Sequence, residues 1–106
     1  MNEFLKNKII GMALASLEED KVKLIALYVL PEYQRQGIGK MLMQKVLDFS
    51  KNSKQIRLEV AAYNQQAINF YQKNGFKLIP ESEDQHEIIP NKFIPTVKMK
   101  KDQKNK

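Results

Sequence analysis

The residues most suggestive of chemistry lie between Leu27 and Leu42, where an apolar strand, a polar turn and two glycines precede an amphipathic helix. Gly37 and Gly39 are two of the four glycines in the chain. Glycine lets the backbone approach a ligand closely, and the first N–H groups of a helix lack partners within the helix and attract anions. The stretch therefore predicts a phosphate-binding loop at the start of this helix.

This loop resembles the acetyl-coenzyme A loop of the GNAT superfamily of N-acetyltransferases. The superfamily pattern is Gln or Arg, two residues, Gly, one residue, then Gly or Ala, and the chain reads Gln34-Arg35-Gln36-Gly37-Ile38-Gly39. The preceding strand, which carries Val29 and is followed by Pro31, and the helix behind the loop make the match more specific than two glycines alone.

A second segment, residues 58–76, resembles the other conserved block of the superfamily. That block is a strand ending in Glu-Val, followed by Asn, Ala, an aromatic–Tyr pair and Gly-Phe, and it corresponds here to Glu59-Val60, Asn64, Ala67, Phe70-Tyr71 and Gly75-Phe76. The spacing is similar to that of the ribosomal-protein N-terminal-alanine acetyltransferases, although many other members share it. With both blocks in the right order, the chain is identified by resemblance as a GNAT superfamily member.

The resemblance implies an acetyl-coenzyme A site between two parallel strands that splay apart at their C-terminal ends. The pantetheine arm would contact the backbone of strand 22–29, and the pyrophosphate would lie on the N–H groups of residues 35–40. The implied cofactor-binding residues are Leu27, Tyr28, Val29, Gln34, Arg35, Gln36, Gly37, Ile38, Gly39, Lys40, Asn64 and Tyr71. No metal site is expected, because the chain has no cysteine and a single histidine, His86.

The resemblance also implies catalytic roles for Glu59 and Tyr71 in the direct attack of an amine on the thioester. Glu59 would remove the amine proton, directly or through water, and Tyr71 would protonate the leaving thiolate. Ordinary pKa values of about 10 for tyrosine and about 8.5 for a thiol make that transfer feasible. Tyr28 and Tyr63 are weaker candidates for the acid.

Each of these residues also has a purely structural explanation. Glu59 shares a strand face with Arg57 and can pair with it, and Asn64 stands where it would cap a helix. Tyr71 falls on the same helix face as Ala67 and Phe70, so core packing accounts for it equally. For Asn64, helix capping and contact with the cofactor are compatible.

The composition places the chain among ordinary globular proteins. Its 106 residues are 42% hydrophobic and 28% charged, which predicts one domain over residues 1–106. The longest apolar run, residues 24–30, is too short to span a membrane, and no signal peptide is evident. Without cysteine there is no disulfide and no acyl-cysteine intermediate on this chain. We expect a cytoplasmic protein with no membrane partner.

The net charge of +6 favours anionic ligands, but much of it comes from lysines near the C-terminus. These are Lys98, Lys100, Lys101, Lys104 and Lys106. Such runs are usually solvated, so we expect residues 100–106 to form a disordered basic tail. The remaining body is nearly balanced in charge, and we therefore expect no nucleic-acid partner.

The order of the expected strands and helices predicts an α/β (α+β) fold with a parallel crossover. The resemblance implies the GNAT fold in particular, with a mixed central sheet, a splayed parallel strand pair and flanking helices. Strand 22–29 is apolar on both faces, which is typical of a central strand covered on both sides. The remaining elements expected are strands 3–6, 8–17, 56–61, 76–79 and 94–99, helices 37–50 and 64–73, and a polar loop over residues 80–90 that contains His86.

A full GNAT domain begins with a strand and two helices ahead of the segment with which this chain opens. Without those helices we expect exposed apolar sheet surface, which favours a homodimer. The expected function is transfer of acetyl from acetyl-coenzyme A to a primary amine: a protein N-terminus, a lysine side chain, a polyamine or a small molecule. The alternative is an acyl-coenzyme A-binding module without turnover.

Overall fold

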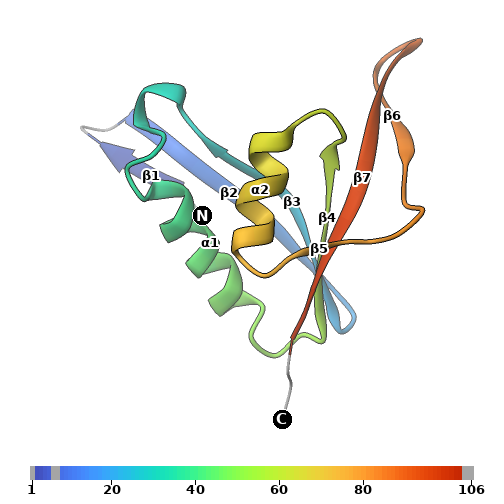
Figure 1. Cartoon of the computed structure of the whole chain (residues 1–106). Coiled ribbons are helices and arrows are strands. Elements are labelled where there is room, and N and C mark those ends of the chain that lie inside the picture. The colour runs from blue at the N-terminus through green and yellow to red at the C-terminus, as the bar shows by residue number, and fades with distance from the viewer. Residues whose placement is uncertain (1, 6–7, 104–106) are drawn as a thin grey trace.

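The computed structural model describes residues 2–5 and 8–103, which form a mixed sheet with helices on one face (Figure 1). Within these residues the sheet has seven strands. The elements in chain order are β1 (Asn2–Leu5), β2 (Lys8–Glu18), β3 (Lys21–Val29), the 3-10 helix η1 (Pro31–Tyr33), α1 (Ile38–Phe49), β4 (Gln55–Ala61), α2 (Gln65–Lys73), β5 (Lys77–Leu78), β6 (Asp84–Ile89) and β7 (Lys92–Asp102). The predicted fold class is confirmed.

The strand order is β1-β2-β3-β4-β7-β5, with β6 paired to β7. Strands β3 and β4 are parallel, and every other pair is antiparallel. The parallel pairing runs from Lys21 opposite Gln55 to Leu24 opposite Leu58 and then stops. Beyond that point the two strands diverge, so the splay that the resemblance implied is present.

The closed end of this splay is held by contacts from the loop before β4. The Lys54 N–H donates to the Asp20 carbonyl at 2.7 Å, and the Lys54 ammonium lies 3.2 Å from the Asp20 carboxylate. The Lys54 ammonium lowers the pKa of that carboxyl. The start of β4 is thus fixed to the turn between β2 and β3, and the two strands open only toward their C-terminal ends.

One face of the sheet and the helices enclose the core. In Figure 1 both α1 and α2 lie on the near side of the sheet. The amphipathic helix expected behind the loop buries Ile38, Leu42 and Val46, whereas Phe49 at its end is 50% exposed. Strand β4 buries Ile56, Leu58 and Val60. Fully enclosed side chains include Leu42, Met43 and Val46 of α1, Val22, Ile56 and Met99 of the sheet, and Phe76.

The opposite side of the sheet is covered by none of the described elements. We call it the open face; it carries Met12, Leu14, Ile25, Tyr28, Arg57 and Glu59. The expectation that β3 is covered on both sides is therefore wrong, since Ile25 is 52% exposed and Tyr28 is 51% exposed. The expected exposure of apolar sheet surface is confirmed by the same residues.

The C-terminal third differs from the sequence-based expectation. Residues 84–89, expected within a polar loop, form β6, which pairs with β7 and places His86 opposite Ile94. Strand β7 extends to Asp102, and the Gln103 N–H donates to the Lys54 carbonyl at 2.8 Å. Residues 100–103 are therefore ordered sheet and an anchored end rather than tail, while residues 104–106 lie outside the described residues. No described helix is long and apolar enough to cross a membrane.

Candidate functional site

The loop between η1 and α1 presents backbone N–H groups with no partner. Arg35 has φ 66° and Gly37 has φ 82°, both in the left-handed region. Gly37 is the N-cap of α1, and its carbonyl accepts the first helical bond, from the Met41 N–H at 3.0 Å. In the described part of the chain, no hydrogen bond is made by the N–H groups of residues 35–40. Such a run of free donors at a helix N-terminus is an anion-binding concavity.

The two glycines of this loop serve different purposes. A Cβ added to Gly37 would meet no heavy atom within 4 Å, so the residue leaves open space and adopts a positive φ. A Cβ on Gly39 would lie 3.5 Å from the Phe70 ring and 3.9 Å from a Val29 methyl group. Gly39 therefore brings α1 close to α2 and β3, while Gly37 keeps the approach to the free N–H groups clear.

Side chains of the loop fix it to the end of β3. The Gln34 Nε2 donates to the Val29 carbonyl at 3.1 Å, and the Gln36 Nε2 donates to the Glu32 carbonyl at 3.4 Å. Ile38 is buried at the start of α1. Gln34, Gln36 and Ile38 thus shape the loop, while the exposed Arg35 and Lys40 add positive charge beside the free N–H groups.

The open end of the splay exposes the backbone of β3. Because pairing with β4 ends at Leu24, the edge of residues 25–29 that faces β4 makes no ladder bond to that strand. Leu27 and Val29 pack their side chains against the core, whereas Tyr28 lies opposite Met12 on the open face. The backbone of Leu27 and the Val29 N–H therefore have no ladder partner on β4, while the Val29 carbonyl already accepts from Gln34. The Tyr28 ring lies on the side away from the helices.

Glu59 lies on the open face where β3 and β4 separate. The Thr96 hydroxyl on β7 donates to its Oε2 at 2.5 Å, and Thr96 itself is only 4% exposed. The structural alternative, in which Glu59 pairs with Arg57, is not seen among the described residues; the Arg57 Nε donates to Gln55 Oε1 instead. Thr96 was not anticipated from the sequence.

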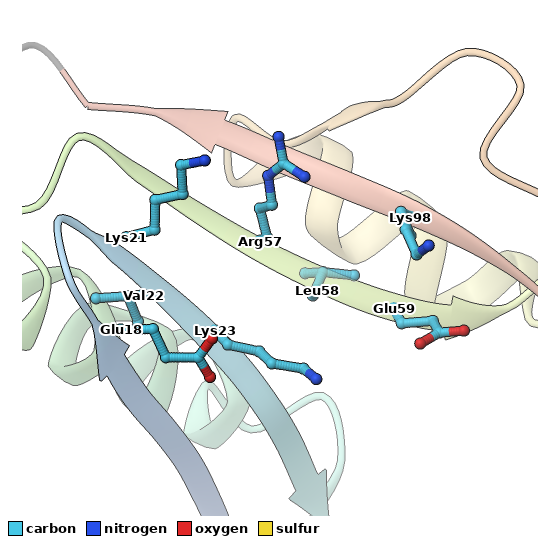
Figure 2. Close-up of a pocket in the computed structure, with 8 residues that line it drawn as sticks. All are labelled: Glu18, Lys21, Val22, Lys23, Arg57, Leu58, Glu59 and Lys98. Carbon is cyan, nitrogen blue, oxygen red and sulfur yellow. The ribbon is translucent and has the colours of Figure 1, made fainter.

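Beside Glu59 is an open hollow of about 220 Å³ on the same face, which we call the basic hollow. Figure 2 shows its lining, with the helices behind the strands. Its charged residues are Glu18, Lys21, Lys23, Arg57, Glu59 and Lys98, above a floor of Val22 and Leu58. A second hollow shares Lys23 and Glu59 and is otherwise lined by Leu24, Ile25, Ala61, Ile94 and Thr96. Glu59 therefore stands between a charged and a more apolar recess.

Tyr71 lies on the helix side of the sheet, packed edge-on between two aromatic rings. Its ring centroid is 5.7 Å from that of Phe70 and 5.8 Å from that of Phe76. Burial raises the pKa of the Tyr71 phenol. At neutral pH the phenol is protonated, and it holds its proton more firmly than an exposed tyrosine does. Glu59 and Tyr71 thus lie on opposite faces of the sheet.

Asn64 caps α2, as the structural explanation predicted. Its Oδ1 accepts from the Ala67 N–H at 3.1 Å, and its amide nitrogen donates no hydrogen bond to any described residue. Contact between Asn64 and the cofactor stays a prediction. Within the described ranges, no three His, Asp or Glu side chains are grouped as metal ligands would be. The His86 side chain lies outside the described part.

Comparison with known proteins supports the same assignment. The model of the acetyltransferase (GNAT) family matches residues 3–76. The chain belongs to the GNAT family. The match covers the loop at residues 35–40, the splay, Glu59 and Tyr71.

Similar proteins in the GNAT family act on several kinds of amine. The chain is 46% identical over 56 residues to the peptidyl-lysine N-acetyltransferase YiaC of Escherichia coli, covering 53% of this chain and 36% of that protein. It is 33% identical over 95 residues to the spermidine N(1)-acetyltransferase of Thermoplasma acidophilum, covering 87% and 57%. The chain thus spans between about a third and three fifths of the length of these curated relatives.

Solved GNAT structures share the fold. The PaiA N-acetyltransferase of Thermoplasma acidophilum, in complex with coenzyme A, is 29% identical with a TM-score of 0.74, covering 95% of this chain and 58% of that one. The ribosomal-protein-S18-alanine N-acetyltransferase of Escherichia coli is 24% identical with a TM-score of 0.78, covering 93% and 64%. The second likeness concerns the fold alone.

The Thr96–Glu59 hydrogen bond gives a first prediction. Replacing Thr96 by Val removes the hydroxyl while keeping the shape, and a hydrogen bond to a charged group contributes about 1.5–3 kcal/mol. We expect kcat of the acetyl transfer proposed below to fall about 10-fold in Thr96→Val, because Glu59 loses its fixed orientation, and to recover in Thr96→Ser. Equal loss in both variants, or loss of folding by circular dichroism, would show that Thr96 acts only in packing.

The buried phenol gives a second prediction, on alkaline stability. The pKa of Tyr71 is raised in the folded state, so the unfolded chain ionises first once the pH exceeds about 10. The stability linked to Tyr71 is complete below that pH and declines as the pH rises further. Urea unfolding at about pH 8 and about pH 11 should show a smaller alkaline loss in Tyr71→Phe than in the original chain. Tyr63→Phe, at a residue 70% exposed, is the control and should match the original chain.

Proposed function

We propose that this chain transfers an acetyl group from acetyl-coenzyme A to a primary amine. The observation that carries the proposal is that two stretches of backbone close together in the chain lack hydrogen-bond partners. These are the N–H groups of residues 35–40 and the edge of β3, at residues 25–29, that faces β4. Coenzyme A has a pyrophosphate for the first and a chain of amides for the second. The family membership and the neighbour that binds coenzyme A support the same reading.

The residues present fit this cosubstrate. The pyrophosphate would lie on the N–H groups beginning at Arg35, in the space that Gly37 leaves open, with Lys40 close by. The pantetheine amides would bond to the backbone at Leu27 and Val29, in place of the missing ladder bonds to β4. In this orientation the thioester would lie near the point where β3 and β4 separate, beside Glu59.

Glu59 is the proposed base for the reaction. A protonated amine is not a nucleophile, so Glu59 accepts its proton, directly or through one water, as the nitrogen attacks the thioester carbonyl. A C–N bond forms, the C–S bond breaks, and the electron pair leaves with sulfur. We expect one backbone N–H near residues 27–29, not taken by the pantetheine arm, to stabilise the oxyanion. Fixing both reactants in the splay is expected to supply much of the rate gain.

Tyr71 is the proposed acid for the departing sulfur. The phenol donates its proton to the thiolate, which gives the free thiol of coenzyme A, and regains it from solvent. Because burial raises the pKa of Tyr71, the transfer is less favourable than between exposed groups. We therefore expect Tyr71 to contribute less to the rate than Glu59.

A binding module without turnover is the second candidate function. It is favoured by one observation: no described element covers the open face where the acceptor would bind. Both candidates require coenzyme A binding, and only the enzyme requires release of thiol that depends on an amine. Assaying thiol release from acetyl-coenzyme A with peptide, lysine, polyamine and small-molecule amines separates them. If the chain binds acetyl-coenzyme A tightly but releases thiol with none of these amines, the result favours the binding module without turnover.

A homodimer through the open face is also proposed. Met12, Leu14, Ile25 and Tyr28 place apolar surface there, and exposed patches of this kind often mark interfaces. A second copy of the chain would remove that surface from water and supply a wall for the acceptor.

A further inference from the structure

We propose that the acceptor amine carries a carboxylate close to its nitrogen, and that the basic hollow recognises this carboxylate. The inference rests on the proposed acetyl transfer and names the class of acceptor, which the family assignment leaves open. The carboxylate could belong to a free amino acid or to an acidic side chain in a peptide; the chemistry recognised is the same.

The first support is the charge of the basic hollow. Four cations, Lys21, Lys23, Arg57 and Lys98, line it beside two carboxylates, those of Glu18 and Glu59. In the portion of the chain that the structure describes, none of the four cations takes part in an ion pair. Like charges gathered on one surface repel one another, and an anion bound among them relieves that repulsion.

The second support is where these cations come from. Lys21 and Lys23 lie on β3, Arg57 on β4 and Lys98 on β7. Lys98 is opposite Glu59 in the register, and Figure 2 shows Lys23 on the other side of the splay from Glu59. The cations thus come from three strands to line one hollow beside Glu59, instead of following one strand as a solvated stripe would.

The third support is chemical. Positive charges near an amine favour its neutral form, because they disfavour the ammonium ion. The neutral form is the one that attacks the thioester. Lys23 and Lys98 would therefore assist the reaction while the carboxylate of the acceptor offsets their repulsion. A polycationic acceptor gains no such compensation and meets four like charges.

The test compares acceptors matched in size and opposite in charge. The small pair is 4-aminobutyrate and 1,4-diaminobutane; the peptide pair has an N-terminal alanine followed by two glutamates or two lysines. At low salt we expect kcat/KM to favour the anionic member of at least one pair by about 10-fold or more, and the pair that responds identifies the source of the carboxylate. Screening by salt should reduce the preference.

The variants are Lys23→Gln and the double variant Lys23→Gln/Lys98→Gln, with Lys51→Gln as the control. Lys51 follows α1 and is outside both hollows. We expect the preference for the anionic acceptor to be smaller in Lys23→Gln, smaller still in the double variant, and unchanged in Lys51→Gln. The inference would be overturned if the chain preferred cationic acceptors, or if its preference for anionic acceptors were unchanged in the double variant.

Binding measured by NMR separates failure of the inference from failure of the proposed function. Glutarate and 1,4-diaminobutane are titrated into the chain saturated with coenzyme A. If glutarate binds more tightly at the basic hollow, and the double variant loses this difference, anion recognition stands even when no amine is acetylated. If both ligands bind equally or neither binds, the inference fails whatever the turnover.

Discussion

Replacing Gly37 by Asp should weaken acetyl-coenzyme A binding by about 100-fold or more. An added Cβ meets no heavy atom within 4 Å, so the cost to the fold is the backbone strain of a side chain at φ 82°. We expect the added carboxylate to lie close to the free N–H groups of residues 35–40 and to repel the pyrophosphate. Two like charges about 4 Å apart repel by ~4 kcal/mol at an effective dielectric constant of about 20, and ~2.7 kcal/mol already equals 100-fold in affinity. Calorimetric titration measures the change directly.

Gly37→Asn is the matched control. Asparagine has nearly the same shape as aspartate and, like it, adopts positive φ more readily than most residues do. It adds bulk and backbone strain without charge. We expect Gly37→Asn to lose far less affinity than Gly37→Asp. Equal loss in the two variants would mean that bulk rather than charge matters, and unchanged affinity in Gly37→Asp would remove the loop from the cosubstrate site.

Replacing Glu59 by Gln should lower kcat by about 100-fold to 10,000-fold, the range for loss of a general base. Glutamine keeps the shape and can still accept the Thr96 hydrogen bond through its amide oxygen. The affinity for acetyl-coenzyme A should stay the same, because the proposed pyrophosphate site is at residues 35–40, away from Glu59 in the sequence. The difference in kcat between Glu59→Gln and the original chain should become smaller as the pH approaches the pKa of the acceptor amine. More of the amine is then neutral without a base to remove its proton.

Glu83→Gln is the control for this experiment. It makes the same change in charge at an exposed residue before β6, outside both hollows. We expect its kcat to match that of the original chain. If Glu59→Gln retained full activity across the pH range, the base would have to be another group or bulk water.

Local sequence signals were sufficient for the loop, the two helices and the strands from residue 8 to residue 61. Gly37 and Gly39 mark a strand-to-helix turn through their own conformational properties, and the apolar spacing of α1 marks its buried face. Asn64 before α2 has the type and position of a cap, and the structure shows that cap. These features depend on neighbours a few residues away.

Features that depend on long-range pairing were missed. Thr96 reaches Glu59 only because β7 pairs with β4 in one register, 37 residues away along the chain. The same pairing carries Lys98, grouped from the sequence with a run of lysines, into the basic hollow. The apolar run of β3 resembled a doubly covered strand because local composition does not reveal which layers are present above a sheet.

The measurement that tests the central claim most directly follows the acetyl group itself. Acetyl-coenzyme A labelled at the carbonyl carbon is incubated with the chain and an excess of the best acceptor amine, and thiol, amide and protein-bound label are measured together. Direct transfer predicts one thiol released for each labelled amide, no label on the protein, and loss of both products in Glu59→Gln. Thiol release without amide, or no turnover with any amine by a chain that binds the cosubstrate, would contradict the account.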